Sequence, residues 1–172
     1  QNQHGPQMPI GTGFFVRVGR GAVHRTTTAN TGGHITQIDH PLANNNPSAF
    51  VTVSPTPFAG VTSGAIDDHA IGVYFDPGTR RWTVFNQDIA AMPLSTGFTI
   101  DVDTPIQRGL HFTHVATSAN RLAHMTRLSS SWLDGKPNAR FLVTPDWTRG
   151  PVYNANEFGV WYDGASWWIY NE

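Results

Sequence analysis

Short apolar runs rich in β-branched and aromatic residues recur along the chain, separated by segments rich in Gly, Pro, Asn and Asp. In the first half they fall near residues 13–18, 22–28, 34–39, 49–54, 70–76 and 81–86. Such runs are typical of strands, and no stretch keeps the roughly 3.6-residue period of an amphipathic helix. Turn sequences such as DPGT and DGAS suit hairpins. The pattern predicts an all-β fold with about six strands in each half.

The two halves repeat one another with a constant spacing of 90 positions, and the shared residues include polar as well as apolar types. The identical pairs are His24/His114, Thr27/Thr117, Ala29/Ala119, Asn30/Asn120, His34/His124, Thr36/Thr126, Pro47/Pro137, Ala49/Ala139, Val53/Val143 and Pro55/Pro145. Self-similarity of this length indicates a duplicated structural unit. We therefore expect two pseudo-symmetric repeats that form a β-sandwich or barrel-like body.

The repeat continues towards the end of each half across length changes that suit loops. Residues 72–76 correspond to 159–163, and GFFVRV at the start of the first half corresponds to GFTIDV in the second. We expect the following organisation, with the repeats packed together as one compact unit: an N-terminal arm over residues 1–12, a first β repeat over 13–96 and a second over 97–172.

Several motifs together resemble a known family. They are VH with TxxAN, GHxTxIDHP, NPxAxxxVxP and the GVWYxxxxWxIFNQD hairpin, of which the last is the most recognisable. The pattern resembles an uncharacterised repeat domain of secreted bacterial proteins that often occurs in tandem, and the resemblance covers nearly the whole chain. It implies a β fold and export, and it brings no known chemistry. The second repeat departs from it at residues 129–131, which are all Ser where residues 39–41 are Asp, His and Pro.

Composition and charge narrow the classes of partner. Only 13% of residues are charged, the formal net charge is -1 and there is no Cys. Without a basic surplus the chain is not expected to bind nucleic acid or an anionic membrane surface. No apolar run is long enough for a membrane span, so we expect no membrane insertion. Disulfides and thiolate metal sites are excluded, because both need Cys.

The location is expected to be extracellular. The low charge, the Thr-, Asn- and Gly-rich composition and a first residue other than Met fit an exported bacterial protein. The opening QNQHGPQMP has neither the basic start nor the apolar stretch of a signal peptide. We therefore predict a secreted protein whose signal peptide has already been removed.

The shared polar residues are the first candidates for a site. In one interpretation, the His residues together with Asn30, Thr36, Asn120 and Thr126 satisfy buried backbone groups at a hairpin turn. In the other, these histidines bind Zn or Cu, with Asp39 or His40 as further ligands. The histidines concerned are His24, His34, His114 and His124. No HxH or HExxH spacing is present, and we favour the structural interpretation.

Catalysis has less support in the sequence. There is no GxSxG elbow, and no Ser, His and Asp stand in a recognisable local context. Asp67, Asp68 and His69 offer acid, base or metal-ligand chemistry, but the second repeat has nothing similar there, and we interpret them as part of a solvated loop. We predict that the chain is not an enzyme and needs no cofactor.

Aromatic residues that differ between the repeats point to ligand binding. Trp132, Trp147 and Trp168 replace a Leu, a Pro and a Thr of the first repeat, whereas aromatic pairs shared by both repeats suit packing. A loop Trp beside amides and carboxylates suits a sugar, whose C–H groups pack on the ring face. The predicted ligand-binding residues are Trp132, Asn138, Asp146, Trp147, Tyr153 and Trp168.

These observations favour a non-enzymatic extracellular binding or adhesion module that recognises a glycan or another cell-surface ligand. The alternative is a structural subunit that assembles into a homo-oligomer, a filament or a surface layer, because weakly charged β domains with an exposed terminal strand can pair edge to edge. The arm over residues 1–12 would then reach onto a neighbouring copy. A His-based metal-binding protein is a third alternative.

Overall fold

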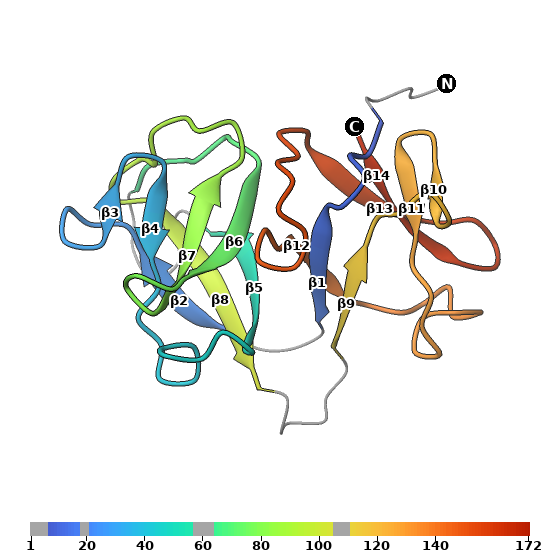
Figure 1. The fold of residues 1–172 in the computed structure, drawn as a ribbon, viewed down its shortest axis with the longest axis horizontal. Coiled ribbons are helices and arrows are strands. Elements are labelled where there is room, and N and C mark those ends of the chain that lie inside the picture. Colours follow the sequence, from blue (N-terminus) through green and yellow to red (C-terminus); the bar gives the residue numbers. More distant parts are fainter. Residues whose placement is uncertain (1–6, 18–20, 57–63, 105–110) are drawn as a thin grey trace.

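The computed structural model describes residues 7–17, 21–56, 64–104 and 111–172, and these residues form an all-β protein (Figure 1). The predicted fold class is confirmed. The described residues include no helix long and apolar enough to cross a membrane. The strands are β1 (Gly13–Arg17), β2 (Ala22–Arg25), β3 (Thr31–Gly32), β4 (Ile35–Gln37), β5 (Phe50–Pro55), β6 (Ile71–Asp76), β7 (Arg81–Asn86), β8 (Gly97–Asp103), β9 (Phe112–Val115), β10 (Arg121–Leu122), β11 (Met125–Arg127), β12 (Leu142–Pro145), β13 (Phe158–Tyr162) and β14 (Trp167–Asn171).

The strands build two similar lobes that lie side by side (Figure 1). Lobe 1 contains a three-stranded sheet, β2-β8-β5, and a four-stranded sheet, β3-β4-β7-β6. Lobe 2 contains the equivalent sheets, β9-β1-β12 and β10-β11-β14-β13. All ladders between these strands are antiparallel. Each lobe therefore reproduces the same order of strands, as the internal repeat predicts.

The lobes differ from the sequence repeats by one strand each. β1 begins the first repeat, yet it pairs with β9 and β12 of lobe 2, and Figure 1 shows this blue strand among orange and red ones. β8 begins the second repeat, yet it pairs with β2 and β5 of lobe 1. Lobe 1 is thus continuous over residues 22–103, whereas lobe 2 joins residues 112–172 to the N-terminal strand. The boundary predicted at residue 97 marks a repeat in sequence and not the edge of a lobe.

Residues 7–12, which precede β1, pack on lobe 2. Met8 is fully buried in the lobe 2 core, and the backbone N–H of Gly11 donates to the carbonyl of Ala116 at 2.7 Å. Met92 takes the equivalent place in lobe 1, where it also lies in the core. Residues 1–6 lie outside the described part of the chain. The sequence predicted an arm that reaches onto a neighbouring copy. In the structure, residues 7–12 instead pack on the second lobe of the same chain.

Each lobe has its own hydrophobic core. In lobe 1, alternate residues of the central strand β8, Phe98, Ile100 and Val102, pack with Val51 and with the fully buried Trp82. On the other face of β8, Asp101 and Asp103 are also buried, so both faces of this strand are largely covered. Among the residues whose burial is described, those buried in the lobe 2 core are Met8, Ala116, Leu128, Leu133 and Ile169.

The lobes meet along β5, β6 and the segment that follows β12. The Thr144 hydroxyl accepts the backbone N–H of Val53 at 2.8 Å. Beyond it, the chain leaves β12 and runs beside β6, with a parallel bridge between Val73 and Asp146. The backbone N–H of Trp147 donates to the Val73 carbonyl at 2.9 Å. This segment of lobe 2 therefore covers the outer edge of the lobe 1 sheet.

Candidate functional site

An aromatic pocket opens where the segment after β12 crosses lobe 1. Its volume is about 280 Å³, and its lining residues come from both lobes. Lobe 1 contributes His34, Tyr74 and Phe85, and lobe 2 contributes Trp147 and Tyr153. Neither lobe alone contains the complete pocket.

Four of the lining rings form a closed cycle of neighbours. Tyr74 lies edge-on to Phe85 with 5.7 Å between ring centroids, and Phe85 lies edge-on to Tyr153 at the same distance. Trp147 completes the cycle at 6.1 Å from Tyr153 and 6.3 Å from Tyr74. These separations are typical of favourable edge-to-face packing, so the rings hold one another in place.

Hydrogen bonds to β6 fix the position of the segment that carries Trp147. Besides its bond to Val73, the segment is held by the Thr148 hydroxyl, which accepts the backbone N–H of Phe75 at 2.8 Å. Asp146 starts the turn and accepts the N–H of Thr148 at 2.9 Å. Its carboxyl is buried, and this burial raises its pKa to about 6, although the nearby Arg149 lowers it in part. Asp146, predicted to contact a ligand, therefore faces the protein interior.

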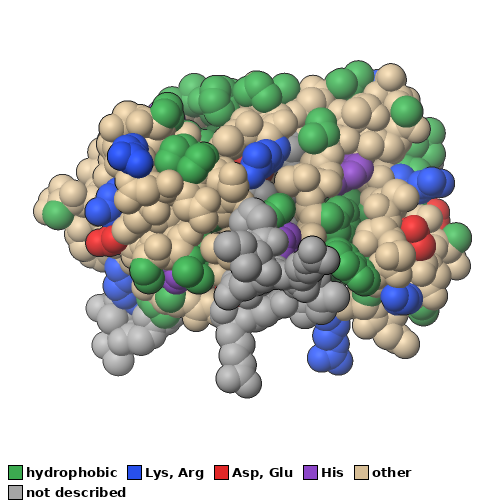
Figure 2. Space-filling model, turned by 60° about the horizontal axis from the view of Figure 1, so that its bottom comes forward, with side chains coloured by type: hydrophobic (Ala, Val, Ile, Leu, Met, Phe, Trp, Pro, Cys, Tyr) green, Lys and Arg blue, Asp and Glu red, His purple; other side chains and the backbone are tan. Residues whose placement is uncertain are grey.

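The pocket has a weakly polar lining. Among the described residues, none that lines it is Asp, Glu, Lys or Arg. Burial raises the pKa of the Tyr74 hydroxyl, with a smaller contribution from Asp76, so this group stays protonated at neutral pH. The indole N–H of Trp147 is buried and has no acceptor among the described residues. On the face drawn in Figure 2, acidic and basic side chains lie scattered rather than gathered in a patch.

The structure brings together two of the predicted ligand-binding residues. Trp147 and Tyr153 line the pocket, whereas Trp132, Asn138 and Trp168 are not among its lining residues. Trp132 and Asn138 are exposed, and the Trp168 indole N–H donates to a carboxylate oxygen of Asp163 at 2.8 Å.

Sequence reasoning missed the lobe 1 side of the pocket. Tyr74 and Phe85 recur as Trp161 and Tyr170 in the second repeat, and this recurrence predicted only a packing role. His34, considered as a metal ligand, instead lies beside these rings. Nothing in the spacing of these residues indicated that a loop of the other lobe would meet them.

The other shared polar residues form the same hydrogen-bonded network in each lobe. In lobe 2, the Asn120 side chain accepts the N–H of Thr117 at 2.7 Å and donates to the carbonyl of Val115 at 2.9 Å. It also accepts the hydroxyl proton of Thr126 at 3.1 Å, and Thr126 lies 2.7 Å from Nε2 of His114. Each residue of the network has its equivalent in lobe 1, with His24 Nε2 2.9 Å from the Thr36 hydroxyl and Asn30 at the turn.

This network determines the tautomer of the buried His114. Because Thr126 gives its only hydroxyl proton to Asn120, it must accept a proton from Nε2 of His114. Burial lowers the pKa of His114 to about 4, and burial also lowers the pKa of His24. Both lowered pKa values favour the neutral ring at pH 7, and in His114 Nε2 is the nitrogen that donates. These contacts support the structural interpretation of Asn30, Thr36, Asn120 and Thr126 over a metal site at His24 or His114.

Comparison with protein families gave one match. The model described as Domain of unknown function (DUF7452) matches residues 1–102 and again residues 77–172. The two matches overlap over β7 and β8, where one lobe ends and the sequence repeat begins again. Neither the curated proteins nor the solved structures gave a match.

Proposed function

The chain belongs to the DUF7452 family as a tandem of two such domains, and we propose that it is a non-enzymatic, extracellular binding module whose aromatic pocket holds a sugar. The observation that carries the proposal is the cycle of four rings contributed by both lobes. Aromatic faces pack on the C–H groups of a sugar, and a few polar groups fix its orientation.

The size and charge of the pocket define the ligand. At about 280 Å³ the pocket lies at the lower end of the usual range for ligand sites, so it suits one small ring or the end of a chain. Since the described lining contains no Asp, Glu, Lys or Arg to pair with a charged ligand, a neutral ligand loses the least hydration on entry. The lining residues that carry polar groups able to orient a ligand are His34, Tyr74 and Tyr153.

A glycan array followed by a fluorescence titration tests this proposal. We expect the wild-type protein to bind a neutral glycan, and Trp147→Ala to weaken binding at least about tenfold, as loss of a central aromatic contact does. Trp132→Ala is the matched control, because it removes an exposed lobe 2 Trp outside the pocket. Loss of binding in Trp132→Ala with retention in Trp147→Ala would place the sugar elsewhere.

A second ligand class provides a direct comparison. A box of aromatic rings also suits a quaternary ammonium group, which is attracted to the ring faces. Choline should therefore be titrated alongside the glycans. Binding of choline without binding of any glycan would refute the sugar proposal while retaining the pocket, and binding of neither would refute both.

The edge strand β13 of lobe 2 favours a second candidate function, the assembly of several copies of the chain. β6 in lobe 1 is covered by the segment after β12, but its equivalent β13 is an edge strand. Val160 and Trp161 on β13 are 40% and 49% exposed. An uncovered strand edge is a template for pairing with another chain. We propose that another copy of this domain covers β13 in the manner that lobe 2 covers β6.

Sedimentation across a range of protein concentrations tests this second proposal. We expect association that Trp161→Lys abolishes, because a charge on an edge strand opposes pairing. The same substitution at another exposed position, Leu122→Lys, is the control. A monodisperse monomer at all concentrations, or equal effects of both variants, would contradict assembly through β13.

A further inference from the structure

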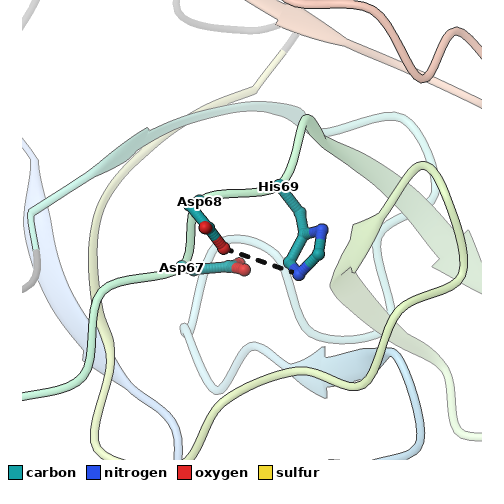
Figure 3. A group of neighbouring side chains, drawn as sticks. All are labelled: Asp67, Asp68 and His69. Carbon is teal, nitrogen blue, oxygen red and sulfur yellow. Dashed lines mark ion pairs between the residues drawn. The ribbon is translucent and has the colours of Figure 1, made fainter.

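Three side chains in the connection between β5 and β6 converge outside the aromatic pocket. Asp67, Asp68 and His69 point towards one another (Figure 3), and their potential ligand atoms all lie within 4.8 Å of one another. Nε2 of His69 is 3.6 Å from Oδ1 of Asp68. Their arrangement differs from the solvated loop expected from the sequence, because Asp67 is only 7% exposed.

A fourth residue orients the histidine ring. Nδ1 of His69 lies 2.7 Å from Oδ2 of Asp88, a contact in which the ring nitrogen must donate its proton. In the neutral ring this leaves the Nε2 lone pair on the side of Asp67 and Asp68. A carboxylate bonded to the second ring nitrogen is the usual support of a metal-binding histidine.

The position in lobe 2 that corresponds to Asp67, Asp68 and His69 contains no acidic residue. Asn154 is the equivalent of Asp67, and it forms a reciprocal amide pair with Asn171 at 2.9 and 3.2 Å. In lobe 1, Asn86 is the equivalent of Asn171 and makes only one contact with Asp67, at 3.3 Å. A carboxylate cannot donate to the Asn86 oxygen, so the second bond of the pair is lost.

This exchange of Asn for Asp leaves two buried oxygen atoms unsatisfied. Oδ2 of Asp67 and Oδ1 of Asn86 have no hydrogen-bond partner among the described residues. A buried carboxylate oxygen without a partner is unfavourable unless a cation or a donor meets it. The sequence of lobe 2, Asn-Ala-Asn, shows that the fold itself does not require this arrangement.

We propose that Asp67, Asp68 and His69 bind a divalent metal ion of the zinc type, with Asp88 as the positioning residue for His69. One imidazole nitrogen and two carboxylates suit Zn²⁺, and three protein ligands leave one position for water. In a tetrahedral site with bonds of about 2.1 Å, two ligand atoms lie ~3.4 Å apart. The His69–Asp68 separation of 3.6 Å is close to this value, and the exposed Asp68 is free to turn. The metal neutralises the unpaired Asp67 oxygen.

Isothermal titration of untagged, metal-depleted protein with ZnCl2 tests the proposal. We expect one Zn²⁺ per chain and a loss of affinity of more than about 100-fold in His69→Ala. Asp88→Asn should weaken binding about 10- to 100-fold, the usual effect of losing the second partner of a ligand histidine. His40→Ala removes another histidine that follows an Asp, so it is the matched control and should bind normally.

Asp67→Asn separates a metal site from a purely structural role. It restores the amide pair seen in lobe 2, so the metal-free variant should melt at a higher temperature than the wild type while losing Zn²⁺ affinity. Bound Co²⁺ should give the visible absorption of a tetrahedral site in the wild type but not in Asp67→Asn. Absence of Zn²⁺ binding, or equal affinity in the wild type and His69→Ala, would overturn the proposal. Neither result depends on sugar binding.

Discussion

Acid should destabilise the protein through the buried histidine of lobe 2. His114 has a pKa lowered by burial to about 4, against 6.5 for the unfolded chain. Between these values the unfolded state binds more protons, so the contribution of His114 to stability is fully present above pH 6.5 and is lost as the pH falls towards 4. From pH 7 to pH 5 the loss from this one residue is about 2 kcal/mol.

Urea unfolding of the wild type and His114→Gln at pH 7 and pH 5 measures this effect. Gln lacks a titrating group and retains an amide donor for Thr126. Whatever the cost of the substitution at pH 7, the wild type should lose about 2 kcal/mol more than the variant on going to pH 5. His24 titrates in both proteins and cancels in the comparison. A wild type–variant difference that is the same at both pH values would refute the buried, neutral state of His114.

Three further predictions test the fold and the pocket. Asp146→Asn should stabilise the protein by up to about 3 kcal/mol at pH 7, because burial raises the pKa of the Asp146 carboxyl to about 6. In urea unfolding this gain in stability should vanish below pH 4. A gain that does not depend on pH would contradict this cause. Gly72→Ala should weaken glycan binding, because a Cβ at this position would lie 2.8 Å from the Phe85 ring. The equivalent variant in lobe 2, Gly159→Ala, crowds Tyr170. It should lower the melting temperature without affecting glycan binding. Val16→Pro should accelerate amide hydrogen exchange in β9 and β12 but not in β2 and β5, and equal acceleration in both lobes would contradict the placement of β1.

Much of the fold follows from local sequence patterns. The period-two runs locate strands such as β5 and β8, because apolar and polar residue types alternate along them in the sequence. The shared turn residues also recur with the same contacts, as Asn30 and Asn120 show. Each of these features depends on residues that are near one another in the chain.

Features that depend on distant pairing could not be predicted in this way. Sequence identity shows that β1 and β8 are equivalent, but it does not show which sheet each one joins. The pocket has the same origin, since Tyr74 and Trp147 meet only because the segment after β12 crosses to the other lobe. The environment of Asp67 became evident only when the structure placed it opposite Asn86.

The indole N–H signal of Trp147 in a ¹H–¹⁵N NMR titration with neutral sugars tests the proposed binding site most directly. The chain has six Trp residues, and Trp147→Phe assigns the signal. We expect this signal to move saturably, because the sugar packs on the Trp147 ring, while the indole signals of Trp82 and Trp167 stay in place through their bonds to backbone carbonyls. A sugar that shifts Trp132 or Trp168 and leaves Trp147 unchanged, or the absence of any shift, would contradict a binding site between the lobes.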